Sequence, residues 1–308
     1  MPAPAPAVEF RAIRHRYGSR LALDGVSFEV GRGEIVGLLG PNGGGKTTLF
    51  KIVSTLLEPS EGTARVFGDD VVRAPAAVRR HLGVVFQRPA LDARLTVEEN
   101  LRHQGHLYGV RGPALASRIR EVLAVVRLED RATDLVATLS GGLQRRAEVA
   151  KSLVHMPDLL VLDEPSTGLD PSARRDIWQD LSQLRDQRGT TVILTTHLMD
   201  EGAACDRVAI LDRGRLVAMG SPASLTDEVG GDVIVLASRT PEHLAGEVRT
   251  RFGVTAEVVD GRVRIERDRA HEFIPGLVES FPGEIDAVSF GKPTLEDVFV
   301  HHTGRRMD

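Results

Sequence analysis

The segment from Gly40 to Thr47 constrains this chain more than any other. It reads Gly-Pro-Asn-Gly-Gly-Gly-Lys-Thr, follows the apolar run at 34–39, and precedes a stretch with helical spacing. It therefore fits the pattern G-x-x-x-x-G-K-[ST] in the strand–loop–helix context that the pattern requires. Glycines let backbone N–H groups approach phosphate closely, and the helix N-terminus adds a favourable field for an anion. The segment predicts a loop that binds the phosphates of a nucleotide.

The side chains at the end of this loop predict how the phosphates are held. Lys46 is placed to reach the β- and γ-phosphates, and the Thr47 hydroxyl is placed to ligate Mg²⁺. Gly44 meets no steric objection in such a loop. The alternative is a Gly-rich turn, although a chance match is expected in roughly one such chain per hundred. The expected nucleotide contacts are Gly40, Pro41, Asn42, Gly43, Gly44, Gly45, Lys46, Thr47 and Thr48.

A second motif ends in two adjacent carboxylates. The run at 159–162 is apolar throughout, as a buried strand is, and Asp163 and Glu164 follow it directly. An acidic group at a strand end beside a phosphate loop suits the Mg²⁺ partner, which is the role expected for Asp163. Glu164 falls on the opposite side of the pleat, so it should have a separate task, such as orienting or deprotonating the attacking water. The alternative is that Asp-Glu-Pro forms a turn or a helix cap.

The order of apolar segments predicts an α/β fold with a mostly parallel sheet. Through the first 225 residues, short runs that are apolar on both faces alternate with helical patterns. Residues 96–156, by contrast, look helical almost throughout, and we expect them to be a helical insertion in the α/β core. The expected strands of the sheet are 34–39, 82–86, 159–162, 191–195 and 208–211.

The end of the chain has a different character. Acidic residues outnumber basic ones after residue 225, and the Gly/Pro-rich positions at 220–222 and 230–231 indicate a domain boundary. The following pattern, β-α-β-β-α-β, is that of a ferredoxin-like unit, and a final helix begins at Thr294. The expected organisation is therefore a disordered Pro/Ala tail at 1–7, a core domain at 8–225 and a small α+β domain at 230–308.

Composition narrows the class of partner. The net charge is −4 with 27% charged residues, whereas a nucleic-acid-binding domain is usually strongly basic, so no nucleic-acid partner is expected. No stretch approaches the ~18 uninterrupted apolar residues of a membrane span, so action at a membrane would require docking on a partner. The single cysteine, Cys205, rules out an internal disulfide, and we expect a packed, reduced thiol.

Further motifs resemble those of the ATP-binding cassette (ABC) ATPases. The segment Leu139-Ser-Gly-Gly142 resembles the family signature and lies in the helical insertion, where the family has it. Ser140 is also placed to cap the helix that follows. Four other residues match in the family's order: Tyr17 for the aromatic that stacks on adenine, Gln87 for the glutamine that contacts Mg²⁺ and faces the membrane partner, Asp170 for the loop that couples two sites, and His197 for the switch histidine that holds the γ-phosphate.

The resemblance implies an active ATPase with two equivalent sites. Ser140, Gly141 and Gly142 of one subunit would complete the ATP site of the other, in a head-to-tail homodimer. The implied catalytic residues are Lys46, Glu164 and His197, and the implied Mg²⁺ ligands are Thr47, Gln87 and Asp163. Leu143 departs from the family, which usually has Gln at that position, and the departure affects only a side-chain contact there.

The last fifteen or so residues indicate which subfamily the chain resembles. Pro293–Phe299 and the following Thr303-Gly-Arg305 resemble the closing motif of ATPases that drive exporters of drugs, antibiotics and polysaccharides. The resemblance implies a peripheral subunit on the cytoplasmic face of the cell membrane, which powers export of a drug, antibiotic, lipid or polysaccharide through a separate integral membrane permease. The permease is expected to dock on Pro89–Leu101. As a structural element, the final helix is expected to pack on the small domain through Leu295, Val298 and Phe299.

Other functions within the family remain open at this point. An ABC ATPase of an importer, or of another membrane process, is the nearest alternative. A soluble ABC ATPase outside transport is a further one. The single phosphate loop and the lack of sustained heptads disfavour the non-transport classes, which carry two ATPase units or long coiled coils.

Overall fold

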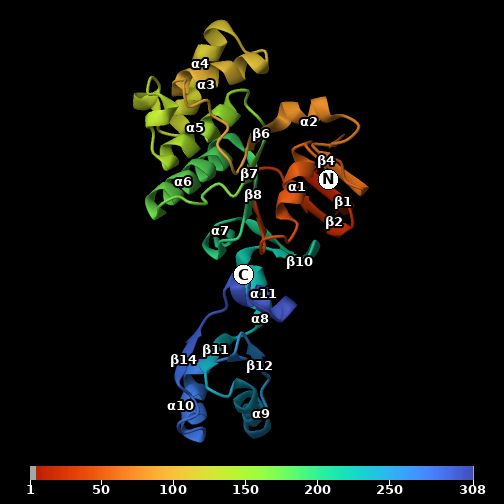
Figure 1. Cartoon of the computed structure of the whole chain (residues 1–308), viewed down its shortest axis with the longest axis vertical. Helices are drawn as coiled ribbons and strands as arrows, with labels where there is room; N and C mark the ends of the chain where they lie inside the picture. Colours follow the sequence, from red (N-terminus) through yellow and green to blue (C-terminus); the bar gives the residue numbers. More distant parts are fainter. Residues whose placement is uncertain (1–4, 308) are drawn as a thin grey trace.

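The computed structural model describes residues 5–307 and is elongated (Figure 1). Strands β1–β10 and their helices occupy one end, strands β11–β14 occupy the other, and helices α8 and α11 lie between them. Residues 1–4 of the expected tail, and Asp308, lie outside the described residues. Ala7 contradicts that part of the expectation, because it is buried and its N–H donates to the carbonyl of Val30 at 2.8 Å.

A six-stranded sheet forms the centre of the larger end, with the order β10-β9-β3-β8-β7-β6. All pairings are parallel except that of β10 with β9, so the predicted, mostly parallel sheet is confirmed. Its inner strands are buried on both faces, which explains their continuous apolar runs. The strands are β3 (Ile35–Leu39), β6 (Leu82–Val85), β7 (Leu159–Asp163), β8 (Thr191–Thr196), β9 (Arg207–Asp212) and β10 (Arg215–Gly220).

A second, antiparallel sheet has the order β2-β1-β4-β5. Its apolar face and the helix α1 (Lys46–Val53) share one buried cluster with the central sheet. Within this cluster, Phe10 packs on Phe28 with ring centroids 4.8 Å apart. The strands are β1 (Val8–Tyr17), β2 (Arg20–Val30), β4 (Glu61–Val66) and β5 (Asp69–Asp70).

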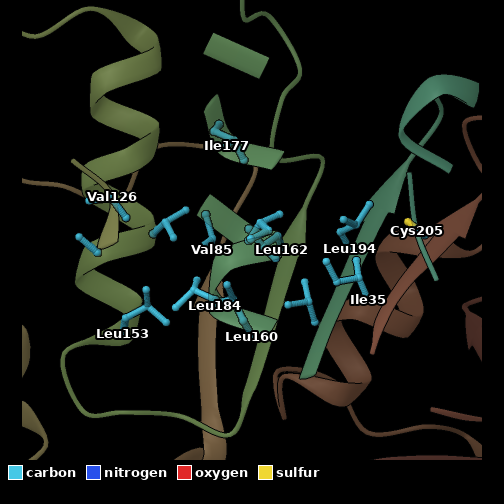
Figure 2. Close-up of a cluster of buried hydrophobic side chains, with 14 of the residues drawn as sticks. Ile35, Val85, Val126, Leu153, Leu160, Leu162, Ile177, Leu184, Leu194 and Cys205 are labelled. Atoms are coloured by element: carbon cyan, nitrogen blue, oxygen red, sulfur yellow. The ribbon is translucent and has the colours of Figure 1, made fainter. Parts of the chain in front are cut away.

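The segment predicted to be a helical insertion contains α3 (Val97–Leu107), α4 (Gly112–Val125) and α5 (Gly141–Leu153). Thr96 and Glu99 form the reciprocal capping box that starts α3. Together with α6 (Pro171–Arg188), these helices share one buried apolar cluster with β6–β8 (Figure 2). Helices α5 and α6 contact the strands, whereas α3 and α4 pack on α5. Two short elements complete the core: α2 (Pro75–His81) and α7 (Met199–Ala203).

Cys205 lies in the same buried cluster, as expected for a packed thiol. Its Sγ donates to the carbonyl of Glu201 at 3.3 Å. Burial raises the pKa of the thiol far above its ordinary value. Gly37 of β3 leaves the room for it, because a Cβ there would lie 2.8 Å from the Cys205 Sγ.

The smaller end has the predicted β-α-β-β-α-β order and an antiparallel sheet of order β12-β13-β11-β14. This arrangement confirms the ferredoxin-like unit. Helices α9 and α10 cover one face of the sheet and share a separate apolar cluster with it. The elements are β11 (Asp232–Ala237), α9 (Pro241–Phe252), β12 (Ala256–Val259), β13 (Arg262–Arg267), α10 (Ala270–Ser280) and β14 (Ala287–Gly291).

The last helix, α11 (Leu295–Thr303), does not pack mainly where the sequence suggested. Its buried residues Leu295, Val298 and Phe299 belong to the cluster of the larger end, together with Leu225 of α8 (Pro222–Val229). The cluster also takes in Val233 of β11, so the stripe lies mainly against the larger end and only in small part against the small domain that the sequence suggested. Helical spacing shows that a helix buries one face, but it does not show what covers that face.

Candidate functional site

The phosphate loop connects β3 to α1 and has the backbone that only glycine adopts easily. Gly40 has φ +156° and Gly45 has φ +109°. A Cβ at Gly40 would lie 2.1 Å from the carbonyl oxygen of Leu211, and one at Gly45 would lie 2.7 Å from Leu23 Cδ2. Gly44 is also tightly packed, because a Cβ there would lie 3.0 Å from the Leu211 oxygen and 3.1 Å from the Pro41 oxygen. A side chain at this position would therefore be crowded, whereas glycine meets no steric objection, as expected.

Lys46 lies beneath this loop and is only 4% exposed. Its Nζ donates to the carbonyls of Gly40 at 2.5 Å and Pro41 at 2.9 Å. Burial lowers the pKa of Lys46, and the charges of Glu164 and Asp163 oppose this shift. An ammonium has three N–H donors, and these two bonds leave one for a phosphate oxygen. The loop therefore fits a bound phosphate chain.

A cavity of about 240 Å³ opens over the loop. Arg20, Lys46 and Lys51 line it with positive charge, and Glu164 is the one carboxylate in the lining. Such a charge distribution suits a polyanion. Tyr17 also lines the cavity, and its half-exposed ring lies edge-on to the ring of His15 with centroids 4.6 Å apart. Other predicted residues of the motif that line the cavity are Asn42, Gly43, Gly45, Thr47 and Thr48, whereas Gly40, Pro41 and Gly44 do not line it.

The two adjacent carboxylates do lie in different environments. Asp163 ends β7 and is buried, and its Oδ1 accepts a hydrogen bond from Thr195 Oγ1 at 2.6 Å. Burial raises the pKa of Asp163, and the hydrogen bond from Thr195 opposes the shift. Glu164 leaves the strand with φ +46°, and its N–H donates to the same Thr195 Oγ1 at 2.9 Å. One hydroxyl thus holds both residues.

The side chain of Glu164 gathers two other residues that the sequence singled out. Its Oε2 accepts from Gln87 Nε2 at 3.0 Å and from Thr167 Oγ1 at 3.1 Å. Its Oε1 lies 3.4 Å from His197 Nδ1. Gln87, Glu164 and His197 follow β6, β7 and β8, whose carboxyl ends meet at one edge of the sheet. Three loops therefore converge on one carboxylate beside the cavity.

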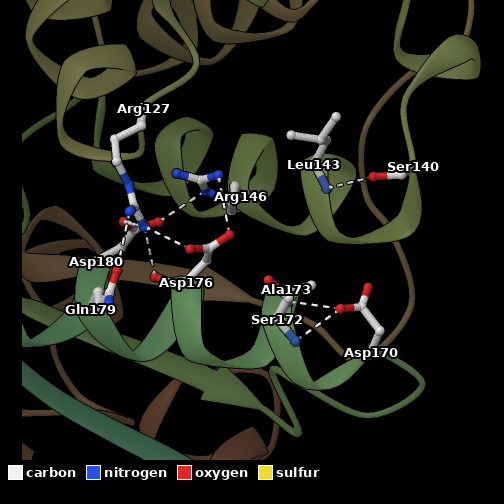
Figure 3. Close-up of polar contacts among 10 residues, drawn as sticks. All are labelled: Arg127, Ser140, Leu143, Arg146, Asp170, Ser172, Ala173, Asp176, Gln179 and Asp180. Carbon is white, nitrogen blue, oxygen red and sulfur yellow. Dashed lines mark hydrogen bonds and ion pairs between the residues drawn. The ribbon is translucent and has the colours of Figure 1, made fainter.

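The signature residues lie elsewhere in the same chain. Ser140 caps α5 and its Oγ accepts from the N–H of Leu143 at 3.4 Å (Figure 3). Asp170 caps α6, and its Oδ1 accepts from the N–H groups of Ser172 at 2.9 Å and Ala173 at 3.0 Å. These backbone donors lower the pKa of Asp170. Neither Ser140, Gly141, Gly142 nor Asp170 lines the phosphate cavity.

Some residues of the site carried no signal in the sequence. In the sequence Thr195 is only the last residue of an expected strand, although its hydroxyl organises both carboxylates. Arg20 and Lys51 line the cavity, but isolated basic residues with ordinary spacing do not stand out. Arg20 begins β2 and Lys51 lies on α1, and the fold brings these two elements to the cavity.

This arrangement is that of a phosphate-loop nucleotide-binding protein. Comparison of the chain with known proteins identifies the family within that class. The ABC transporter family model matches residues 23–167. Full-length relatives include the Nod factor export ATP-binding protein I of Burkholderia lata, 41% identical over 99% of both chains. Another is the daunorubicin/doxorubicin resistance ATP-binding protein of Streptomyces peucetius, 37% identical over 99% of this chain and 94% of the relative. The chain belongs to the ABC transporter ATP-binding family, and it is an ATPase that binds and hydrolyses ATP.

Solved structures agree with this assignment. One ATP-binding subunit of an ABC transporter is 30% identical, with a TM-score of 0.65 over 73% of this chain and 93% of that chain. The ATP-binding cassette MJ0796, solved as a dimer in a post-hydrolysis state with ADP and phosphate, is 27% identical, with a TM-score of 0.62 over 70% and 98%. Among residues 5–307, no helix is long and apolar enough to cross a membrane.

Proposed function

We propose that this chain is the energy-supplying subunit of an exporter, and that two copies assemble head to tail around two ATP molecules. The convergence of Gln87, Glu164 and His197 beside the phosphate cavity carries the proposed hydrolysis, and the export functions named for full-length relatives support export. Glu164 is the general base for the attacking water, and His197 is within reach of the same carboxylate. Lys46 binds the β- and γ-phosphates from beneath the loop.

The donor set also fits a magnesium ion. Thr47 offers a hydroxyl, Gln87 an amide oxygen and Asp163 a carboxylate, and these are the hard oxygen ligands that Mg²⁺ prefers. The buried carboxyl of Asp163, whose pKa is raised by desolvation, would be relieved by a cation. When bound, Mg²⁺ would neutralise charge on the transferring phosphoryl group. The residues proposed to hold it are Thr47, Gln87 and Asp163.

The position of the signature supports the dimer. Ser140 stands at the N-terminus of a thirteen-residue helix, which favours an anion, yet it does not line this chain's own phosphate cavity. A second copy in head-to-tail orientation brings that helix end to the γ-phosphate. The ATP site is then shared, and neither copy completes it alone. Asp170 is proposed to couple the two sites from the N-terminus of α6.

A separate cavity supports the docking of a permease at the cytoplasmic face of the membrane. Its volume is about 470 Å³, and Phe86, Ala90, Gln104 and Tyr108 are among its lining residues. Ala90 lies in the segment Pro89–Leu101, which begins two residues after Gln87, and the other three residues lie outside it. We propose that a loop of the permease occupies this cavity and moves the segment when the dimer closes.

The proposed domains keep the expected bounds. Residues 8–225, with their helical insertion at 96–156, form the ATPase domain, and residues 230–308 form the accessory domain. Helix α11 belongs to the second by sequence, but its apolar face packs with the first.

The experiment that tests the site is the substitution Glu164→Gln. The amide keeps the shape of the side chain but cannot accept a proton, so we expect ATP binding to persist while kcat falls at least a hundredfold, as is typical of losing a general base. The trapped ATP should also give a dimer in size-exclusion chromatography. A variant that hydrolyses ATP at the normal rate would show that Glu164 is not the base.

Export is tested in inside-out membrane vesicles that contain the chain with its co-purifying permease. The probe is daunorubicin, a compound that appears in the name of one of the relatives. We expect ATP-dependent accumulation inside vesicles that carry the wild-type chain and none with Glu164→Gln. ATP-driven loss of preloaded compound from the vesicles would instead indicate import.

A further inference from the structure

Arg145 lies in the first half of the signature helix α5, five residues after Ser140, yet its side chain does not reach solvent. It is only 7% exposed. The helix runs past the carboxyl ends of β6 and β7, and the guanidinium extends to the two loops that begin there. A buried arginine at such a crossing calls for a complete set of hydrogen-bond partners.

All three nitrogens of the guanidinium have such partners. The Nε donates to the carbonyl of Pro165 at 2.8 Å, and Nη2 donates to the carbonyl of Asp163 at 3.0 Å. These two carbonyls flank Glu164 on either side. The Nη1 donates to the carbonyl of Phe86, the residue before Gln87. One side chain thus holds the backbone around two of the three groups that converge beside the cavity.

Glu148 is the ionic partner of this arginine. It lies one turn further along α5, is 5% exposed, and its Oε2 accepts from Arg145 Nη1 at 2.9 Å. Its Oε1 accepts from the N–H of Ala90. The carbonyl of Ala90 in turn accepts from Lys151 Nζ at 2.5 Å. Helix α5 therefore holds both backbone groups of Ala90, at the start of the segment proposed to meet the permease.

The backbone of Glu164 needs this support. A φ of +46° is unfavourable for a residue with a Cβ, and such a conformation persists only where its surroundings fix it. Thr195 holds the N–H of Glu164, and Arg145 holds the carbonyls before and after it. The planar guanidinium can reach three carbonyls at once, whereas the single ammonium of lysine cannot reproduce that geometry.

We propose that Arg145 is a positioning residue for ATP hydrolysis, which fixes Glu164 and Gln87 relative to each other through their neighbouring carbonyls. Its partner Glu148 extends the same network to Ala90. The inference rests on the proposed role of Glu164 as the general base. It deepens that role by naming the side chain, supplied by the signature helix of the same subunit, that holds the base in place.

The next residue of α5 provides a matched control. Arg146 is 8% exposed and also forms a buried ion pair, with its Nε 3.1 Å from Asp180 Oδ2. This contact ties α5 to α6, and Arg127 shares the same aspartate (Figure 3). Arg146 makes no hydrogen bond to the loops that carry Gln87 or Glu164. A general disturbance of a buried ion pair should therefore affect the two positions alike, and a loss of positioning should affect only Arg145.

The experiment compares Arg145→Lys with Arg146→Lys in the full-length chain, with Mg²⁺ and ATP. A displacement of about 1 Å at a reacting group can lower a rate about a hundredfold. We expect Arg145→Lys to lower kcat by roughly ten- to a hundredfold, with the Kd for ATP changed by less than about twofold because the phosphate cavity is intact. Arg146→Lys should keep kcat within about threefold, at a similar shift in Tm.

A double variant protects the test against misfolding. Arg145→Met with Glu148→Leu removes both members of the ion pair, so no unpaired charge stays buried. We expect this protein to fold, to bind ATP as the wild type does, and to hydrolyse it as slowly as Arg145→Lys. If its kcat is normal, or if the two lysine variants lose activity equally, Arg145 does not position the site. Normal hydrolysis by Glu164→Gln would instead overturn the proposed function itself.

Discussion

At the scale of single residues, burial works against the charges that the phosphate site requires. Desolvation raises the pKa of Asp163 and lowers the pKa of Lys46, so both groups are less easily charged in the folded protein than in water. Both are needed in their charged forms, one for a cation and the other for phosphate. Stability of the protein without ligand and activity with ligand therefore make opposite demands here.

This conflict predicts that Asp163→Asn stabilises the chain without nucleotide while it impairs hydrolysis. The amide keeps an acceptor for Thr195 and removes a buried charge, so we expect a gain of roughly 0.5–2 kcal/mol in the free energy of unfolding at neutral pH, the range of common stabilising substitutions. Urea unfolding of both proteins, without Mg²⁺ or ATP, measures the difference. We expect kcat to fall because Mg²⁺ loses its carboxylate.

The pH dependence of that difference has a definite sign. The folded pKa of Asp163 lies above its ordinary value, so the ionised group opposes folding above this pKa, and protonation removes the effect as the pH falls towards the ordinary value. The advantage of Asp163→Asn should therefore shrink on acidification. Asp170→Asn is the control, because hydrogen bonds from backbone N–H groups lower the pKa of that exposed cap, and no gain is expected. An advantage that grows on acidification would contradict the assignment.

Individual residues were predictable where a motif puts them next to one another. Lys46 and Thr47, and likewise Asp163 and Glu164, stand in short runs whose chemistry depends on local order. Thr195 and Arg145 were not predictable in the same way, because they act on backbone groups of loops far away in the sequence. Such contacts depend on which strands are neighbours, and residue types alone do not contain that information.

At the scale of elements, the contact between α5 and α6 determines how the signature helix sits on the core. The two helices approach so closely at Gly142 that a Cβ there would lie 2.7 Å from the Cβ of Ala173. Further along, Arg127 and Arg146 share the buried carboxylate of Asp180, which lies on α6 (Figure 3). A close glycine contact and an ion cluster thus fix the relative position of these helices.

Gly142→Ala should therefore destabilise the chain more than Gly141→Ala. At Gly141 the nearest atom to an added Cβ is Leu169 Cδ2 at 3.9 Å, an ordinary contact. At Gly142 the added methyl has to push α5 away from α6, and overpacking of this kind costs about 1–3 kcal/mol. Thermal unfolding without nucleotide compares the two, because both substitutions are otherwise identical. Equal Tm values would mean that the two helices separate freely.

The elements themselves were largely predictable, because apolar periodicity identified the parallel strands, the helical insertion and the β-α-β-β-α-β order. It was less predictable which elements pack against one another. The sequence placed α11 on the small domain because the two are adjacent in the chain. The structure buries Leu295, Val298 and Phe299 with the core of the larger end instead. An apolar stripe can be buried equally well against the small domain or against the larger end, so the sequence pattern could not decide between the two surfaces.

At the scale of the whole molecule, α11 links the two ends. Arg264 of the small sheet pairs with Asp297 at the start of α11, and Arg305 after its end pairs with Asp212 of β9. The turn that follows Asp212 reaches the phosphate loop, because the N–H of Gly214 donates to the carbonyl of Gly44 at 3.0 Å. Helix α11 lies between the two ends (Figure 1), and packing and ion pairs therefore connect the accessory domain to the ATP site.

Two phenylalanines near the end of the chain differ in their place in this connection. Phe299 of α11 is fully buried in the cluster of the larger end, whereas Phe290 of β14 is 55% exposed. Phe299→Ala leaves a cavity in the core, so we expect a loss of about 3–5 kcal/mol in the free energy of unfolding. Phe290→Ala should cost less than about 0.5 kcal/mol, as is usual for surface substitutions.

Hydrogen–deuterium exchange shows which elements lose stability in Phe299→Ala. If α11 is part of the larger end, Phe299→Ala should speed exchange in α7 and α8, on which the helix packs, more than in β12 and β13 of the small sheet. Faster exchange confined to the small sheet would restore the packing suggested by sequence order. Because β9 leads into the turn that meets the phosphate loop, a loosened α11 should also weaken ATP binding, and Phe290→Ala should leave it unchanged.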